Sequence, residues 1–226
     1  MNIKNKLSLI KNKLLFSDSI TQKQRIQNII LASAVSFVFL LCIQFLQFVT
    51  DCRDIRSDVL RLHVIANSDT DIDQDVKLKV RDAVLTKGAE IFDGSVNVKN
   101  AKEKLTPELE KLEKEADSVL NENGLGYGAK VKLTDEYFPV REYENFTLPS
   151  GRYMSLTVTL GSGEGHNWWC VMFPPLCLPA AEDKESVYDA VFSQEETQII
   201  ENKQKYKIKF KILEWTDEII EKLRLR

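Results

Sequence analysis

A stretch of 25 residues without a charged side chain, between Arg25 and Asp51, most constrains what this chain can fold into. It contains the apolar run IILASAVSFVFLLCI at residues 29–43. Because a helix rises about 1.5 Å per residue, roughly 20 apolar residues cross the hydrocarbon core of a bilayer. The stretch lacks the charged face that a helix on a soluble domain would carry. We therefore predict one transmembrane helix at residues 26–49.

The charges on either side of this stretch predict its orientation. Residues 1–50 contain six Lys or Arg and one acid, a charge of +5, and since the whole chain carries −3, the remainder carries −8. Positive flanks stay in the cytoplasm, so residues 1–25 are predicted to be a basic cytoplasmic tail and residues 50–226 an extracytoplasmic domain. The stretch is either a signal anchor or a cleavable signal peptide. Small residues of the cleavage type occur only at 32–34, where the apolar run begins, which favours the anchor.

The remaining 176 residues fit one domain of ordinary size. An acidic body lacks the clustered basic face that binds phosphate backbones, which argues against nucleic acid as a partner. Periodicity predicts helices at 72–91 and 97–122, the second interrupted at Pro107, and strands around them. Residues 193–196 (SQEE) resemble a capping box that opens a further short helix. We expect an α+β domain with helices on a mainly antiparallel sheet, in which residues 152–160 and 168–173 form a hairpin. The predicted strands are at 60–66, 129–133, 138–143, 152–160, 168–173 and 206–215.

Residues 67–71 (NSDTD) are predicted to cap the helix at 72–91, because their side-chain oxygens can accept hydrogen bonds from the free backbone amides of its first turn. Aspartates alternate from 69 to 75 as in a calcium loop, but Gln74 and Val80 occupy the positions of the required glycine and glutamate. Two histidines at 63 and 166 have no partners at zinc spacing. No catalytic triad, phosphate loop or glycine-flanked nucleophile is present, so we predict no metal, no cofactor, no small-molecule substrate and no catalytic residue.

The segment NWWCVMFPPLC at 167–177 is the most distinctive candidate for binding. Adjacent tryptophans in a strand point to opposite faces of the sheet, so one can lie in the core while the other is exposed and contacts a partner. The alternative is that helices of the domain cover both rings. Oxidising conditions outside the cell would allow a disulfide between Cys170 and Cys177, and two reduced core thiols are the alternative. We predict partner contacts at Trp168, Trp169, Phe173, Pro174 and Pro175, and secondary contacts at Arg61, His63, Asn67 and Asp69.

Two blocks of the sequence resemble stage II sporulation protein R of endospore-forming bacteria. They are LHVIANSDTDIDQDVKLKVRDAVL at 62–85 and FPVREYENFTLPSGRYMSLTVTLGSGEGHNWWCVMFPPLC at 138–177, in which Ser155 replaces an expected alanine. The resemblance implies a protein exported from the forespore into the space between forespore and mother cell. It also implies a partner, the membrane-embedded aspartic protease of the mother cell that processes pro-sigma-E. A messenger role without catalysis follows, and the alternatives are an extracytoplasmic cell-wall hydrolase or a structural tether between membranes.

Overall fold

The structure is a computed structural model that describes residues 3–95, 97–143, 146–176 and 191–224, with side chains described from residue 22 onward except at position 203. Contacts divide the chain into Met1–Phe48 and Val49–Arg226, and we call Val49–Arg226 the body. The elements in chain order are α1 (Ile3–Ser57), β1 (Leu60–Ile65), α2 (Asp71–Phe92), α3 (Val98–Leu105), η1 (Thr106–Glu108), α4 (Leu109–Glu122), β2 (Ala129–Phe138), β3 (Arg141–Glu142), β4 (Thr147–Leu148), β5 (Gly151–Leu160), β6 (Asn167–Phe173), α6 (Gln194–Glu201) and α7 (Lys203–Arg224).

Helix α1 contains the stretch predicted to cross a membrane. Its portion Gln22–Ser57 reaches a mean hydropathy of 2.6 over 18 residues, which is apolar enough and long enough to span a bilayer. The helix is therefore consistent with a single-pass anchor. A signal sequence has the same length and composition, so both interpretations of the segment stand.

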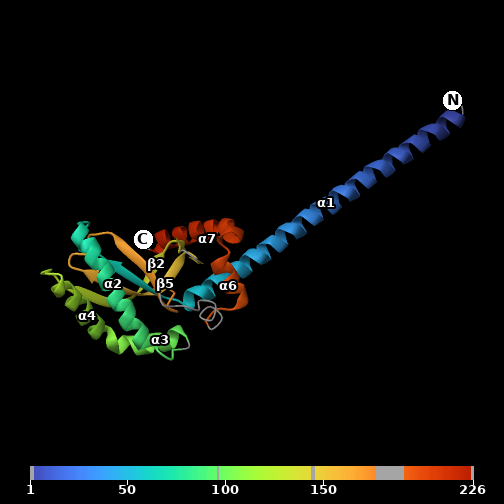
Figure 1. Cartoon of the computed structure of the whole chain (residues 1–226). Helices are drawn as coiled ribbons and strands as arrows, with labels where there is room; N and C mark the ends of the chain where they lie inside the picture. The colour runs from blue at the N-terminus through green and yellow to red at the C-terminus, as the bar shows by residue number, and fades with distance from the viewer. Residues whose placement is uncertain (1–2, 96, 144–145, 177–190, 225–226) are drawn as a thin grey trace. The chain divides into compact units, whose positions relative to one another are not determined.

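The body is built on a four-stranded sheet in the order β2-β5-β1-β6. Strand β1 pairs in parallel with β5, whereas β6 pairs with β1 and β2 pairs with β5 in antiparallel fashion. Strands β3 and β4 form a separate antiparallel pair. Helices pack on this mostly antiparallel mixed sheet, which confirms the α+β prediction (Figure 1).

The predicted hairpin between β5 and β6 is wrong, because β1 lies between the two strands. The loop at residues 161–166 crosses the end of β1 and bonds to the loop that follows it, with Gly165 N donating to Ala66 O at 2.9 Å. A glycine-rich loop between two strands is typical of a hairpin. The local pattern could not show that a strand from much earlier in the chain would be inserted between them.

Alternate residues of β1 face two different environments. Leu60, Leu62 and Val64 belong to the main hydrophobic core with residues of α2, α3 and α4, and all three are fully buried. Arg61 and His63 are also buried but face the other side of the sheet, where they meet Phe138 and Trp169. One face of the sheet is thus apolar, and the other carries charge.

The predicted strand at 206–215 is wrong, because these residues belong to helix α7. Lysines at alternate positions gave the segment the period of a strand. The residues that the helix buries follow the helical period instead: Phe210 and Leu213 are each 3% exposed. Four and eight residues after Leu213, Asp217 accepts a hydrogen bond from Ser150 at 2.8 Å and Glu221 pairs with Arg152 at 2.6 Å.

The predicted helix ends are confirmed where their caps are described. Thr70 caps α2, its hydroxyl accepting from the amide of Asp73. Ser193 and Glu196 form the predicted capping box of α6. The helical pattern breaks near Pro107 into α3, η1 and α4, which is the expected effect of a proline inside a helix.

Candidate functional site

Two loops meet at the edge of the sheet where β1 and β5 end and β6 begins. The loop after β1 bonds to the loop before β6 through Glu164 N to Asn67 O at 3.2 Å and Ser162 N to the Asn67 side chain at 2.9 Å. Parallel strands direct their carboxyl ends to one edge, where binding sites commonly form in such sheets. We call this region the strand-end surface, made up of Asn67, Ser68, Asp69, Asp73, Lys77, His166 and Trp168.

A glycine permits this close approach of the two loops. A Cβ at position 165 would lie 2.2 Å from the carbonyl oxygen and 2.6 Å from the carbonyl carbon of Ser68. Both atoms belong to the backbone, so they cannot move aside as a flexible side chain would. Only Gly165 allows the loops to pack at this distance.

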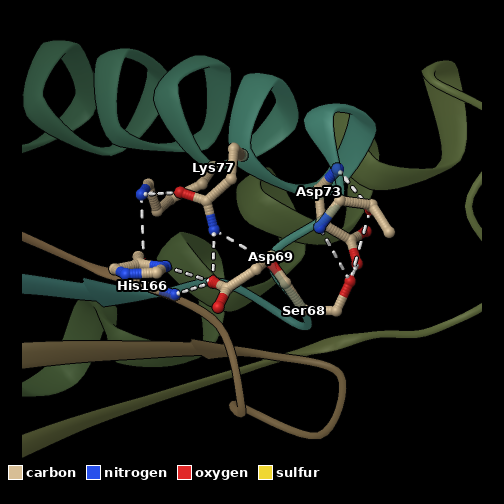
Figure 2. Close-up of polar contacts among 7 residues, drawn as sticks. Ser68, Asp69, Asp73, Lys77 and His166 are labelled. Carbon is tan, nitrogen blue, oxygen red and sulfur yellow. Dashed lines mark hydrogen bonds and ion pairs between the residues drawn. The ribbon is translucent and has the colours of Figure 1, made fainter.

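Asp73, in the first turn of α2, organises the strand-end surface (Figure 2). It is 5% exposed and accepts hydrogen bonds from Ser68 Oγ at 2.5 Å, from Asn67 Nδ2 at 2.9 Å and from the Tyr127 hydroxyl. Burial raises the pKa of this carboxyl, but the hydrogen bonds outweigh it, so the net pKa is lowered. Asp73 therefore remains a carboxylate that fixes both the loop after β1 and the start of β2.

Asp69 and His166 form the exposed part of the same surface. Asp69 Oδ1 lies 2.7 Å from the His166 amide and 2.5 Å from its Nδ1. Hydrogen bonds from His166 lower the pKa of Asp69. Lys77 of α2 anchors the pair: it is 4% exposed and donates to the His166 carbonyl at 3.1 Å (Figure 2). Burial lowers the pKa of Lys77.

The two tryptophans of β6 point to opposite faces of the sheet, as predicted. Trp168 is 37% exposed, on the face that α2 covers, and the Arg81 guanidinium lies 4.5 Å from its ring. Trp169 is on the other face, stacked on His63 with ring centroids 3.8 Å apart. Trp168 thus adds an exposed aromatic ring to the strand-end surface, whereas Trp169 supports the charged face of the sheet.

The charged face contains a residue that the sequence did not single out, Glu136 on β2. Its carboxylate lies 2.8 Å from His63 Nδ1 and accepts from the hydroxyls of Thr134, at 2.6 Å, and Thr157. Burial raises the pKa of Glu136, but these hydrogen bonds outweigh it and hold the pKa at about 2. Alternating polar residues on β2 were the available signal, but only the strand order places them beside His63.

Arg61 lies in an aromatic cage on the same face. It is fully buried, with its guanidinium carbon 4.2 Å from the Phe138 ring centre and 5.0 Å from that of Tyr153. Its Nε donates to the Cys170 carbonyl at 3.2 Å and its Nη2 to the Tyr143 hydroxyl at 2.7 Å. In this arrangement Arg61 of β1 is bonded to β6 and to the residue that follows β3, and its guanidinium is buried away from the surface.

The structure separates the predicted contact residues into three groups. Arg61, His63 and Trp169 lie on the charged face of the sheet. Asn67, Asp69 and Trp168 lie together at the strand-end surface. Phe173, 4% exposed, and Pro174 are buried, and with Pro175 they lie at the other end of β6. Trp168 and Phe173 are five positions apart along the strand, which corresponds to roughly 17 Å.

Cys170 is disulfide-bonded, whereas Cys42 and Cys52 are free. The predicted partner, Cys177, lies outside the described residues. Among the residues that the structure describes, no group of three or more His, Cys, Asp or Glu is placed to hold a metal ion. Two of the alternating aspartates, Asp69 and Asp73, are instead engaged by loop side chains and amides.

Comparison with known proteins identifies the family. The sequence model of the family described as Stage II sporulation protein R matches residues 56–183, more than half of the chain. The chain belongs to the stage II sporulation protein R family. Stage II sporulation protein R of Bacillus subtilis (strain 168) is 30% identical over 185 residues, covering 73% of this chain and 83% of that protein. No solved structure matches.

The stage II sporulation protein R match contains the strand-end surface and all of the main sheet, from β1 to β6. It ends before α6 and α7, so these C-terminal helices lie outside the matched segment. Membership in this family supports a role in sporulation.

Proposed function

We propose that the chain is a sporulation signal whose extracytoplasmic body binds and activates the mother-cell membrane protease that processes pro-sigma-E. The observation that carries the proposal is the family match over residues 56–183. The apolar portion of α1 supports it, since a signal made in the forespore must be exported or anchored with its body outside the cytoplasm. In this proposal the body lies in the space between the two membranes and performs no catalysis.

The strand-end surface is the proposed contact with the protease. It combines an exposed tryptophan, Trp168, with an exposed Asp69–His166 pair, and hot spots of binding are built from such aromatic and charged groups. Asp73, Lys77 and the closely packed loops hold it in one conformation, which limits the entropy lost on binding. To activate the protease, the surface must bind its active arrangement more tightly than its inactive one.

The test is processing of pro-sigma-E in sporulating cells whose only copy of the signal carries a substitution. Trp168→Ala removes the exposed ring, and loss of a hot spot worth about 2 kcal/mol weakens binding roughly 30-fold. We expect pro-sigma-E to remain uncleaved in this strain. The matched variant Trp168→Phe keeps an aromatic ring, so cleavage should be largely retained.

Trp169→Ala should lower stability as well as signalling, because its ring stacks on His63. Equal protein levels, measured by immunoblot, are required before either result is interpreted. Normal cleavage with Trp168→Ala and Asp69→Ala combined would exclude the strand-end surface as the contact. If the purified protein degraded peptidoglycan unaided, the hydrolase alternative would replace the proposal.

A further inference from the structure

Helix α7 carries an apolar stripe that the body does not cover. Its residues repeat every three to four positions, and each side chain is at least 40% exposed: Ile208 77%, Ile212 43%, Trp215 65%, Ile219 40% and Leu223 66%. A soluble domain seldom leaves a continuous apolar stripe of this kind in water, and such stripes mark contacts with proteins or membranes. A tryptophan at its centre is typical of the interface between a membrane and water.

The charges of α7 are divided between its two sides. Three of its acids face the body: Glu214 accepts from the Val140 amide at 3.1 Å, Asp217 from Ser150, and Glu221 from Arg152. The lysines flank the stripe. The exposed ones are Lys207, Lys211 and Lys222 on one side and Lys205 on the other, where Lys209 is half-buried. Because three of the four carboxylates are used inward, the outer side of the helix is apolar with a mainly basic border, in which Glu218 is the one exposed acid.

The same helix is held close to the point where the chain leaves the predicted membrane segment. Arg56 donates to the Ser150 carbonyl at 2.6 Å and pairs with Asp217 of α7 at 3.5 Å. Arg56 comes six residues after Thr50, the last residue of the uncharged stretch. Six residues span at most about 20 Å even when fully extended. With an uncleaved anchor, the middle of α7 cannot move far from the bilayer.

We propose that α7 is a second membrane contact, lying flat on the outer surface of the membrane that holds the anchor, with its apolar stripe among the lipid headgroups. An amphipathic helix with bulky apolar residues on one side and lysines beside them binds anionic lipid surfaces in this way. Each exposed lysine is attracted by the negative surface potential. The body is then attached at two points, which fixes its orientation on the membrane.

The test uses the full chain reconstituted into lipid vesicles. Brominated lipid tails quench a tryptophan that enters the membrane, and subtracting the spectrum of Trp215→Phe isolates the signal of Trp215. In vesicles containing phosphatidylglycerol, we expect bromolipid to reduce this signal by at least half. Replacing phosphatidylglycerol with phosphatidylcholine should reduce the quenching severalfold, and so should the double variant Lys207→Gln and Lys211→Gln.

Trp215 is exposed, so its replacement should leave the unfolding midpoint of the body unchanged. An unchanged midpoint shows that a lost membrane contact is not caused by unfolding. A Trp215 signal that bromolipid does not quench in either vesicle would overturn the proposal. Shielding of Trp215 from an aqueous quencher that increases with protein density but not with bromolipid would also overturn it, because a second copy would then cover the stripe. Equal quenching in neutral and anionic vesicles would refute the proposal that the lysines of α7 recognise anionic lipids.

Discussion

Replacing Asp73 by Asn tests whether one buried carboxylate organises the strand-end surface. The carboxylate accepts from three side chains, those of Ser68, Asn67 and Tyr127, and it is 5% exposed. An amide of the same size has only one acceptor oxygen. Its NH₂ group would therefore face at least one of these donors without water to compensate.

The magnitude follows from the hydrogen bonds lost. A hydrogen bond to a charged group contributes about 1.5–3 kcal/mol, and a buried donor left unpaired costs a similar amount. Since the Asn oxygen can still accept some of these hydrogen bonds, we expect the free energy of unfolding to fall by about 3 kcal/mol. For a domain of this size that corresponds to a midpoint lower by roughly 6–12 °C.

The assay is thermal unfolding of the full chain in detergent, followed by near-ultraviolet circular dichroism of the body. The matched control is Asp69→Asn, in the same loop but with an exposed carboxylate, which should leave the midpoint unchanged. Because the pKa of Asp73 is lowered from 3.8 in the folded protein, its contribution is fully present above pH ~4 and fades as the pH falls through the lower folded value. A midpoint for Asp73→Asn equal to wild type, or an equal loss with Asp69→Asn, would refute this reasoning.

Three further predictions concern the rest of the body. Glu136→Gln should destabilise by about 2 kcal/mol at neutral pH, and because the pKa of Glu136 falls from 4.5 to about 2, the difference should fade as the pH drops through that interval in an unfolding titration. Gly165→Ala should lower the unfolding midpoint through its backbone clash, whereas Gly126→Ala, which meets nothing within 4 Å, should not. Peptide mass spectrometry without reductant should find Cys170 linked to Cys177, and a free Cys177 would contradict the predicted pairing.

The sequence predicted those parts of the fold that depend on local pattern. The cap at Thr70, the capping box at Ser193 and the break near Pro107 each follow from the preference of one residue type for one backbone position. The opposite orientations of Trp168 and Trp169 follow from the two-residue period of a strand. The membrane-spanning stretch was recognisable because it depends only on length and on the absence of charge.

What the sequence could not predict depends on contacts between distant residues. The insertion of β1 between β5 and β6 rests on pairing across about 100 positions, which no local pattern encodes. The same pairing brings Glu136 beside His63, so the charged face was missed. Helix α7 was missed because its alternating lysines have the period of a strand, while its helical period appears only over a longer stretch, in the buried Phe210 and Leu213 and in the exposed apolar stripe.

The account depends most on the chain activating the protease from outside the cytoplasm. The direct measurement is cleavage of pro-sigma-E in proteoliposomes that contain the purified protease, with the full chain supplied on the extracytoplasmic side. We predict that cleavage requires the chain on that side and is lost with Trp168→Ala. Cleavage that is unaffected by the chain, or that occurs equally when its body is on the cytoplasmic side, would contradict the account.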